Sequence, residues 1–146
     1  MTSLTDSLAS EANKPAVVDD CLQLIDAEVA DKSGFSGFAI KAGYGAVKGI
    51  RPGFIRQAVG DLIPEFAVAL DPIYQEAKSK NQPTAEYFKA QSERVADALL
   101  AITDAKAKKS KSGVVKGTYE KLRSSAKKNV EAAVPRLGQM VQKHAG

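Results

Sequence analysis

Apolar residues recur along most of the chain at alternating steps of three and four residues, which places them on one side of an α-helix. Residues 15–31 contain the clearest early stripe, formed by Val18, Cys21, Ile25 and Val29. Pro15 suits the first turn of this helix and Gly34 its end. No competing stretch shows the alternation of apolar and polar positions that a half-buried strand requires. The pattern therefore predicts an all-α protein.

Residues 36–50 have a helical pattern in spite of four glycines, each of which costs up to about 1 kcal/mol against alanine in a helix interior. Close packing against another backbone would compensate for these losses. Small residues on one face of the stretch allow such an approach: Ala42, Gly45, Ala46 and Gly49. We therefore expect a glycine-faced helix that packs tightly inside the protein, or that joins one copy of the chain to another.

The middle of the chain combines helical stripes with strong helix breakers. Residues 51–53 are Arg-Pro-Gly and predict a turn, after which residues 54–59 form a short helical piece that stops at Gly60. A longer helix follows, and Pro72 lacks the backbone N–H that would bond four residues back. A kink or a restart is expected there, with Asp71 as its cap. Farther on, Thr84 can cap one helix that continues to Ala105, and residues 106–112 form a lysine-rich linker or helix end.

The last helix has the longest apolar stripe of the chain. It opens at Ser112 or Gly113, and its stripe continues over more than about seven turns. The stripe consists of Val115, Tyr119, Leu122, Ala126, Val130, Ala133, Leu137 and Val141. Because the stripe stays in phase beyond Pro135, that proline is expected to bend the helix without ending it. Residues 1–146 therefore predict a single-domain helical bundle of about five to seven helices, with a long basic C-terminal helix.

The composition fits one soluble domain. The 146 residues are 44% hydrophobic and 26% charged, both ordinary fractions for a soluble protein. The single Cys21 cannot form an internal disulfide, and residues 1–12 lack the apolar run of a secretory signal. Residues 35–50, the longest weakly polar run, fall short of the roughly 20 apolar residues that span a bilayer. We therefore expect a cytoplasmic protein.

Positive charge is concentrated in one segment. Residues 106–128 contain nine Lys and Arg residues and one acid, Glu120, in a chain whose net charge is only +4. Charge of one sign gathered on one segment creates a field that attracts phosphates or anionic headgroups. The candidate polyanion-binding residues are Lys106, Lys108, Lys109, Lys111, Lys116, Lys121, Arg123, Lys127 and Lys128. Alternatively, the acidic residues 1–31 could pair with the basic helix inside the molecule and leave little free positive charge.

No catalytic or metal-binding set stands out. Tyr44 and Lys48 match the Tyr-x-x-x-Lys spacing of short-chain dehydrogenases, but no strand and no glycine-rich phosphate turn precede them. Cys21 lies on an apolar stripe, which favours a buried structural thiol, and His144 lies close to the end, where chains commonly fray. One Cys and one His cannot build a zinc site. We therefore expect a protein that is not an enzyme and that uses no metal and no cofactor.

Three binding hypotheses remain open. The basic segment favours a polyanion, above all nucleic acid bound without sequence preference, because no helix-turn-helix or zinc-finger spacing is present and Tyr119 is the only aromatic residue among the lysines. The small-residue face favours a homo-oligomer. Residues 35–50, in which Lys41 and Lys48 stand among apolar residues, would suit an anionic membrane surface, although a core helix of a soluble bundle has the same pattern. No small-molecule substrate is indicated.

A resemblance to known proteins rests on three parts of the chain. They are Pro15-Ala-Val-Val-Asp-Asp-Cys through Gly34-Phe-Ser-Gly-Phe-Ala-Ile-Lys-Ala-Gly-Tyr, Val95-Ala-Asp-Ala-Leu-Leu-Ala-Ile-Thr-Asp-Ala, and Tyr119-Glu-Lys-Leu-Arg through Ala133-Val-Pro-Arg-Leu. Together they resemble a family of small bacterial proteins of unassigned function, familiar from actinobacteria, over most of the chain. The resemblance implies a bacterial cytoplasmic protein, and it lends no activity, cofactor or catalytic residue.

Overall fold

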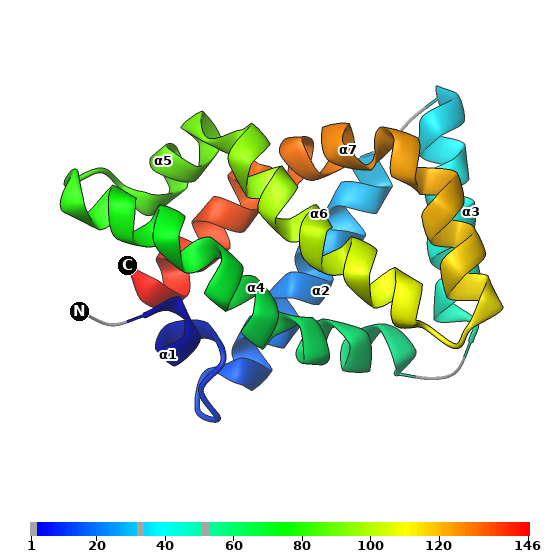
Figure 1. Cartoon of the computed structure of the whole chain (residues 1–146), viewed down its shortest axis with the longest axis horizontal. Helices are drawn as coiled ribbons and strands as arrows, with labels where there is room; N and C mark the ends of the chain where they lie inside the picture. The colour runs from blue at the N-terminus through cyan, green and yellow to red at the C-terminus, as the bar shows by residue number, and fades with distance from the viewer. Residues whose placement is uncertain (1–2, 32–33, 51–52) are drawn as a thin grey trace.

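The computed structural model describes residues 3–31, 34–50 and 53–146, without the side chains of residues 35, 36, 38 and 39. These ranges form seven α-helices and no strand (Figure 1). The helices are α1 (Leu4–Leu8), α2 (Lys14–Asp31), α3 (Gly34–Lys48), α4 (Phe54–Ser79), α5 (Thr84–Ala90), α6 (Ser92–Lys109) and α7 (Gly113–Ala145). The predicted all-α fold with a long C-terminal helix is confirmed.

The longest helix, α7, connects the parts of the bundle. Its first half runs beside α3 in the opposite direction, and its second half crosses the molecule towards the C-terminus (Figure 1). α7 contacts α3, α6 and α5 in turn, and it also contacts α1 and α2. The other long helix, α4, packs against α1, α2 and α6. Every part of the bundle therefore rests on α4 or on α7.

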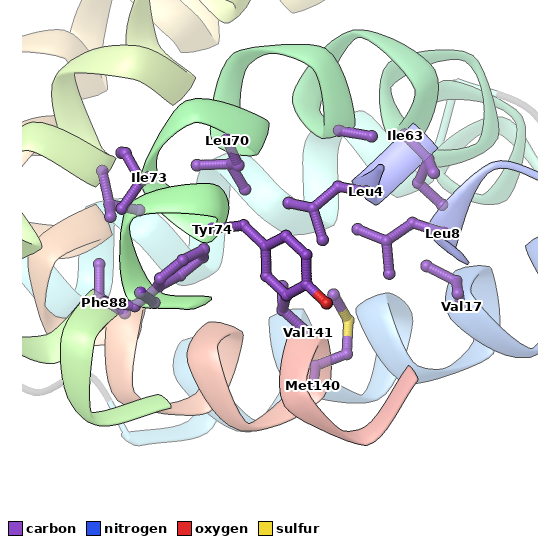
Figure 2. Close-up of a cluster of buried hydrophobic side chains, with 14 of the residues drawn as sticks. Leu4, Leu8, Val17, Ile63, Leu70, Ile73, Tyr74, Phe88, Met140 and Val141 are labelled. Atoms are coloured by element: carbon purple, nitrogen blue, oxygen red, sulfur yellow. The ribbon is translucent and has the colours of Figure 1, made fainter. Parts of the chain in front are cut away.

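The buried core lies around the second half of α7 (Figure 2). Its larger members are Leu4, Leu8, Val17, Ile63, Leu70, Ile73, Tyr74, Phe88, Met140 and Val141. Burial of each such side chain stabilises the fold by about 1.5–3 kcal/mol relative to exposure. By contrast, no side chain of residues 101–109 or 113–133 is fully buried, and in the described part of α3 only Gly37 is buried. We call α3 together with these two segments the thin end of the bundle.

The predicted break at Gly60 is wrong, because α4 is one helix from Phe54 to Ser79. Contacts with α1, α2 and α6 along its length hold the helix together and outweigh the local cost of glycine and proline. Pro72 leaves the carbonyl of Val68 without its helical partner. Val68 is 64% exposed, so this turn faces water, which can supply the missing hydrogen bond.

The two residues predicted to cap helices here bond elsewhere. Asp71 Oδ1 accepts a hydrogen bond from the backbone N–H of Leu4 at 2.9 Å, and so anchors α1 to α4. Thr84 is buried in the first turn of α5, where its hydroxyl donates to the carbonyl of Gly146 at 2.9 Å. Both side chains therefore join distant parts of the chain, a role that local sequence patterns cannot reveal.

The single helix predicted from Thr84 to Ala105 is two helices in the structure. α5 ends at Ala90 and α6 begins at Ser92, with Gln91 between them. The break allows α5 to pack against the second half of α7 and α6 against its first half (Figure 1). Phe88 and Val95, on either side of the break, are both fully buried. Tertiary packing therefore sets this boundary, which no glycine or proline marks in the sequence.

Several other predicted boundaries are confirmed. Ser112 caps α7, since its Oγ accepts a hydrogen bond from a backbone N–H of the first turn at 3.3 Å. Pro135 lies inside α7 and does not end it. The prediction that Gly34 ends the helix of residues 15–31 is wrong, because α2 ends at Asp31 and Gly34 is the first residue of α3. Of the predicted turn, residues 51–52 lie outside the described residues, and Gly53 has a φ of 77° where α4 begins, a conformation that favours glycine.

Candidate functional site

The predicted polyanion-binding residues lie on the last turn of α6, in the linker 110–112 and on the first half of α7. The two helices form a hairpin, and α3 lies beside the α7 half of it (Figure 1). The structure thus brings the basic residues into one region at the thin end. How much of their charge is free depends on the acids that face them.

Three of the nine basic residues pair with acids of α4 and α6. Lys106 Nζ lies 2.9 Å from Glu65 Oε2, and Lys127 Nζ lies 3.2 Å from Asp97 Oδ1. Arg123 binds Asp104 through two nitrogens, with Nε 2.8 Å from Oδ1 and Nη2 3.2 Å from Oδ2. For these three residues the expectation of a free cationic face is wrong, because carboxylates that are distant in sequence fold onto them.

Tyr119, the predicted stacking residue, is held inside the hairpin. Its hydroxyl donates to Asp104 Oδ1 and lies 2.8 Å from the hydroxyl of Thr103. Hydrogen bonds from Arg123 and Tyr119 lower the pKa of Asp104, in that order of effect. The same contact raises the pKa of Tyr119, although burial of the ring contributes more. Tyr119 therefore joins α7 to α6 through its hydroxyl, and its ring is half-buried.

Six of the predicted residues are exposed, and none of them forms an ion pair with a described residue. They are Lys108, Lys109, Lys111, Lys116, Lys121 and Lys128, which we call the free lysines. Two carboxylates act on them: Glu120 lies in the same segment, and the charge of Lys108 makes a small contribution to the lowered pKa of Asp104. Positive charge therefore remains in excess around the α6–α7 hairpin after the three ion pairs are removed.

The acidic N-terminal part pairs with α7, but beyond the basic segment. Arg136 Nη1 lies 2.7 Å from Glu28 Oε1, and its Nη2 lies 2.7 Å from Asp31 Oδ2. Asp20 accepts from Lys143 Nζ at 3.0 Å and lies 2.6 Å from His144 Nε2. The bond with His144 is the main cause of the lowered pKa of Asp20. The acids of α2 therefore hold the second half of α7 in place, and the ion pairs they form do not involve the free lysines.

Cys21 has the surroundings of a structural thiol. Its Sγ donates to Met140 Sδ at 3.4 Å, at the edge of the buried core. Burial, with a smaller contribution from neighbouring Asp20, raises the pKa of the thiol to about 11. Because the thiolate is the nucleophilic form, Cys21 is poorly suited to covalent catalysis.

Tyr44 and Lys48 lack the geometry of a catalytic pair. The Tyr44 hydroxyl donates to Asp26 Oδ1 at 2.6 Å, and Lys48 Nζ lies 4.9 Å from the centroid of the ring. Burial and the bond to Asp26 raise the pKa of Tyr44 to about 12, whereas a catalytic tyrosine needs a lowered value. Both residues line an open cleft of about 230 Å³ between α2, α3 and the start of α4. The hydrogen bond from Tyr44 fixes α3 to α2.

The small-residue face of α3 is not packed inside the protein, contrary to the prediction. Ala42, Gly45, Ala46 and Gly49 are all exposed, and a Cβ added at Gly45 would have no neighbour within 4 Å. The close contact of α3 is made by Gly43 instead. A Cβ at that position would lie 2.8 Å from Thr118 Cγ2 and 3.3 Å from Leu122 Cδ1 of α7. Among Gly43, Gly45 and Gly49, Gly43 is thus the one that packs closely against another helix, while the predicted face points to solvent.

Metal and membrane sites receive no support from the described residues. Within these ranges no group of three or more His, Cys, Asp or Glu side chains could hold a metal ion. None of the described helices combines the length and the apolar character needed to cross a membrane. Ile40 and Val47, which could have anchored α3 at a membrane surface, are half-buried, and the side chains of Phe35 and Phe38 lie outside the described part of the chain.

Comparison with known proteins assigns the chain to a family. No curated protein and no solved structure matches it. A family model described as a family of unknown function (DUF6918) matches residues 4–145, nearly the whole length from α1 to the end of α7. The expected likeness to proteins of unassigned function is therefore confirmed, and the chain belongs to the DUF6918 family.

Proposed function

We propose that this protein is a non-enzymatic cytoplasmic protein that binds nucleic acid without sequence preference. The proposal depends on one observation: the free lysines are exposed around the α6–α7 hairpin, and none of them forms an ion pair with a described residue. Phosphate groups are the natural partners of such lysines, because they bring negative charge at a close and regular spacing.

The chemistry of the surface explains why no sequence preference is expected. Lysine contacts to phosphate position a protein on nucleic acid but distinguish no base. The single aromatic residue of the segment, Tyr119, has its hydroxyl bonded within the hairpin. Binding should therefore come from release of counterions and weaken steeply as salt is added. If all six free lysines contacted phosphates, the logarithm of the binding constant would fall with the logarithm of salt concentration with a slope of about −5.

The test is a titration of a labelled duplex, followed by fluorescence anisotropy over a range of salt concentrations. Lys121→Gln with Lys128→Gln removes two exposed charges that form no ion pair with a described residue. We expect weaker binding and a salt slope less negative by about 2. The matched control is Lys14→Gln with Lys89→Gln, which removes two charges on α2 and α5. It should leave the slope unchanged.

Two results would overturn the proposal. The first is an absence of binding at micromolar protein and low salt. The second is binding that ignores added salt, since contacts to phosphate always release counterions.

Self-association through Ala42, Gly45, Ala46 and Gly49 is the second candidate function. It is favoured by the exposure of this face, because nothing within the described chain compensates for the helical cost of Gly45 and Gly49. Light scattering would show a concentration-dependent mass for the native protein, and Gly45→Leu would abolish it. Gly117→Leu, on an exposed and equally open position of α7, is the control. A monomer at all concentrations removes this candidate.

A further inference from the structure

We propose that the nucleic-acid surface extends onto α3, where Lys41 and Lys48 form its second side. The inference rests on the proposed function and adds to it a part of the chain far from the basic segment in sequence. Both lysines are exposed, and neither forms an ion pair with a described residue. Lys48 Nζ lies 4.9 Å from the centroid of the Tyr44 ring, beside the cleft between α2, α3 and the start of α4. α3 itself contains no acidic residue.

The position of α3 follows from two contacts. Gly43 faces α7, since a Cβ on it would meet Thr118 Cγ2 at 2.8 Å and Leu122 Cδ1 at 3.3 Å. Tyr44, the next residue, faces α2 through its hydrogen bond to Asp26 at 2.6 Å. These two directions define the inner side of α3, which also contacts α4. The exposed residues Ala42, Gly45, Ala46 and Gly49 lie away from it.

Helical geometry then places the lysines of α3. With about 100° per residue, Lys41 and Lys48 lie roughly 140–160° around the helix from Gly43. They therefore point away from α7, next to the side that contacts α2. Between these lysines and α7 lie the exposed residues Ala42, Gly45, Ala46 and Gly49. From residue 41 to residue 49, the described residues on that strip are all alanine or glycine.

The same geometry places two of the free lysines on the other side of the strip. Arg123 and Lys127 face α6, where they pair with Asp104 and Asp97. Around the helix from Leu122, which faces α3, Lys121 and Lys128 lie about 100–120° in the direction opposite to that of Arg123 and Lys127. They are therefore on the outer side of α7, next to α3. α3 and the first half of α7 run side by side in Figure 1. Over residues 41–49 of α3, the outer surface of the thin end thus has lysines along both edges and small residues between them.

The positive charge of this surface favours a nucleic-acid backbone over a second copy of the chain. An extended chain of phosphates could lie over the small residues, which allow its backbone to approach closely, and meet lysines on both sides. A second copy of this protein would instead bring Lys41 and Lys48 of two molecules towards each other, and like charges oppose such a contact. The surface therefore fits a nucleic-acid backbone better than a second copy of the chain.

The test compares three double variants in the anisotropy titration with a duplex: Lys41→Gln with Lys48→Gln, Lys121→Gln with Lys128→Gln, and the control Lys14→Gln with Lys89→Gln. We expect the first two pairs to make the salt slope less negative by about 2 each, at about 0.9 per lost phosphate contact. The control should keep the native slope. Circular dichroism verifies that each variant stays folded.

The outcomes separate this inference from the proposed function. If the native protein binds no duplex, both fail. If Lys121→Gln with Lys128→Gln weakens binding while Lys41→Gln with Lys48→Gln behaves like the control, the proposed function stands and the extension onto α3 is wrong. Sedimentation with anionic vesicles without any binding of duplex would overturn the nucleic-acid partner in favour of a lipid surface.

Discussion

Two glycines of α7 should respond in opposite ways to the same substitution. Gly117 is exposed, and a Cβ added to it would have no neighbour within 4 Å. Gly138 is buried against α5, where a Cβ would lie 3.0 Å from Ala85 Cα, 3.2 Å from Ala85 O and 3.3 Å from Phe88 Cβ. Alanine in a helix interior is favoured over glycine by about 0.5–1 kcal/mol. Gly117→Ala should therefore raise the free energy of unfolding by that amount.

Gly138→Ala gains the same free energy from the higher helix propensity of alanine, but its Cβ must displace a neighbouring backbone. The atoms in its way belong to the main chain of α5 and to Phe88, which is fully buried, so neither can rotate aside. Overpacking of this kind typically costs about 1–3 kcal/mol. The net effect is a loss of up to about 2 kcal/mol, and the two variants should differ by about 1–3 kcal/mol.

Urea unfolding followed by circular dichroism measures both effects, because the dependence of free energy on urea should be the same in all three proteins. The midpoint should rise for Gly117→Ala and fall for Gly138→Ala. If Gly138→Ala were as stable as Gly117→Ala, the close approach of α5 to α7 would not exist as described.

Three further predictions concern other parts of the fold. Hydrogen bonds from Arg94 and Tyr87 lower the pKa of Glu76 from 4.5 to about 2. The stability that these hydrogen bonds add to the fold is therefore present above pH 4.5 and lost as the pH falls through 2. Arg94→Gln should thus be less stable than the native protein at neutral pH, and urea unfolding should show this difference vanish at about pH 2; a constant difference would contradict the linkage. Alkylation of Cys21 should be slow in the folded protein at neutral pH, because the thiol pKa is about 11, and fast in denaturant; rapid labelling of the folded protein would show that the thiol is accessible. Leu70→Ala, in the buried core, should cost about 2–5 kcal/mol, whereas Leu122→Ala, at a half-buried position of the thin end, should cost clearly less; equal losses would contradict the uneven packing.

The elements predicted well are those whose signals are local. Ser112 and the long stripe after it define α7, because a capping hydroxyl and helical periodicity act within a few residues of each other. The break at Gly60 was predicted on the same local grounds and is wrong, since contacts with other helices override helix propensity in α4. The split at Gln91 has no local signal, because it serves the packing of α5 and α6 on different parts of α7.

The candidate site was predictable only in part. The concentration of lysines is a property of the sequence, but their partners are not, since Lys106 and Glu65 lie 41 positions apart and meet only in the fold. Lys41 and Lys48, which we propose as the second side of this surface, are considered from the sequence only for an anionic membrane, because their place beside α7 arises only in the fold. One signal pointed to them: a fifteen-residue helix with two lysines and no acid. That signal becomes meaningful only when α3 is known to lie against α7.

The uneven burial along the bundle gives its two ends different tendencies to open. The core around the second half of α7 should resist amide hydrogen exchange up to the free energy of global unfolding, whereas α3 and residues 113–133 should exchange through smaller, local openings. The lysines that we propose to contact nucleic acid lie at this less stable end. Local opening there would let the surface adjust to an irregular partner while the rest of the fold stays intact.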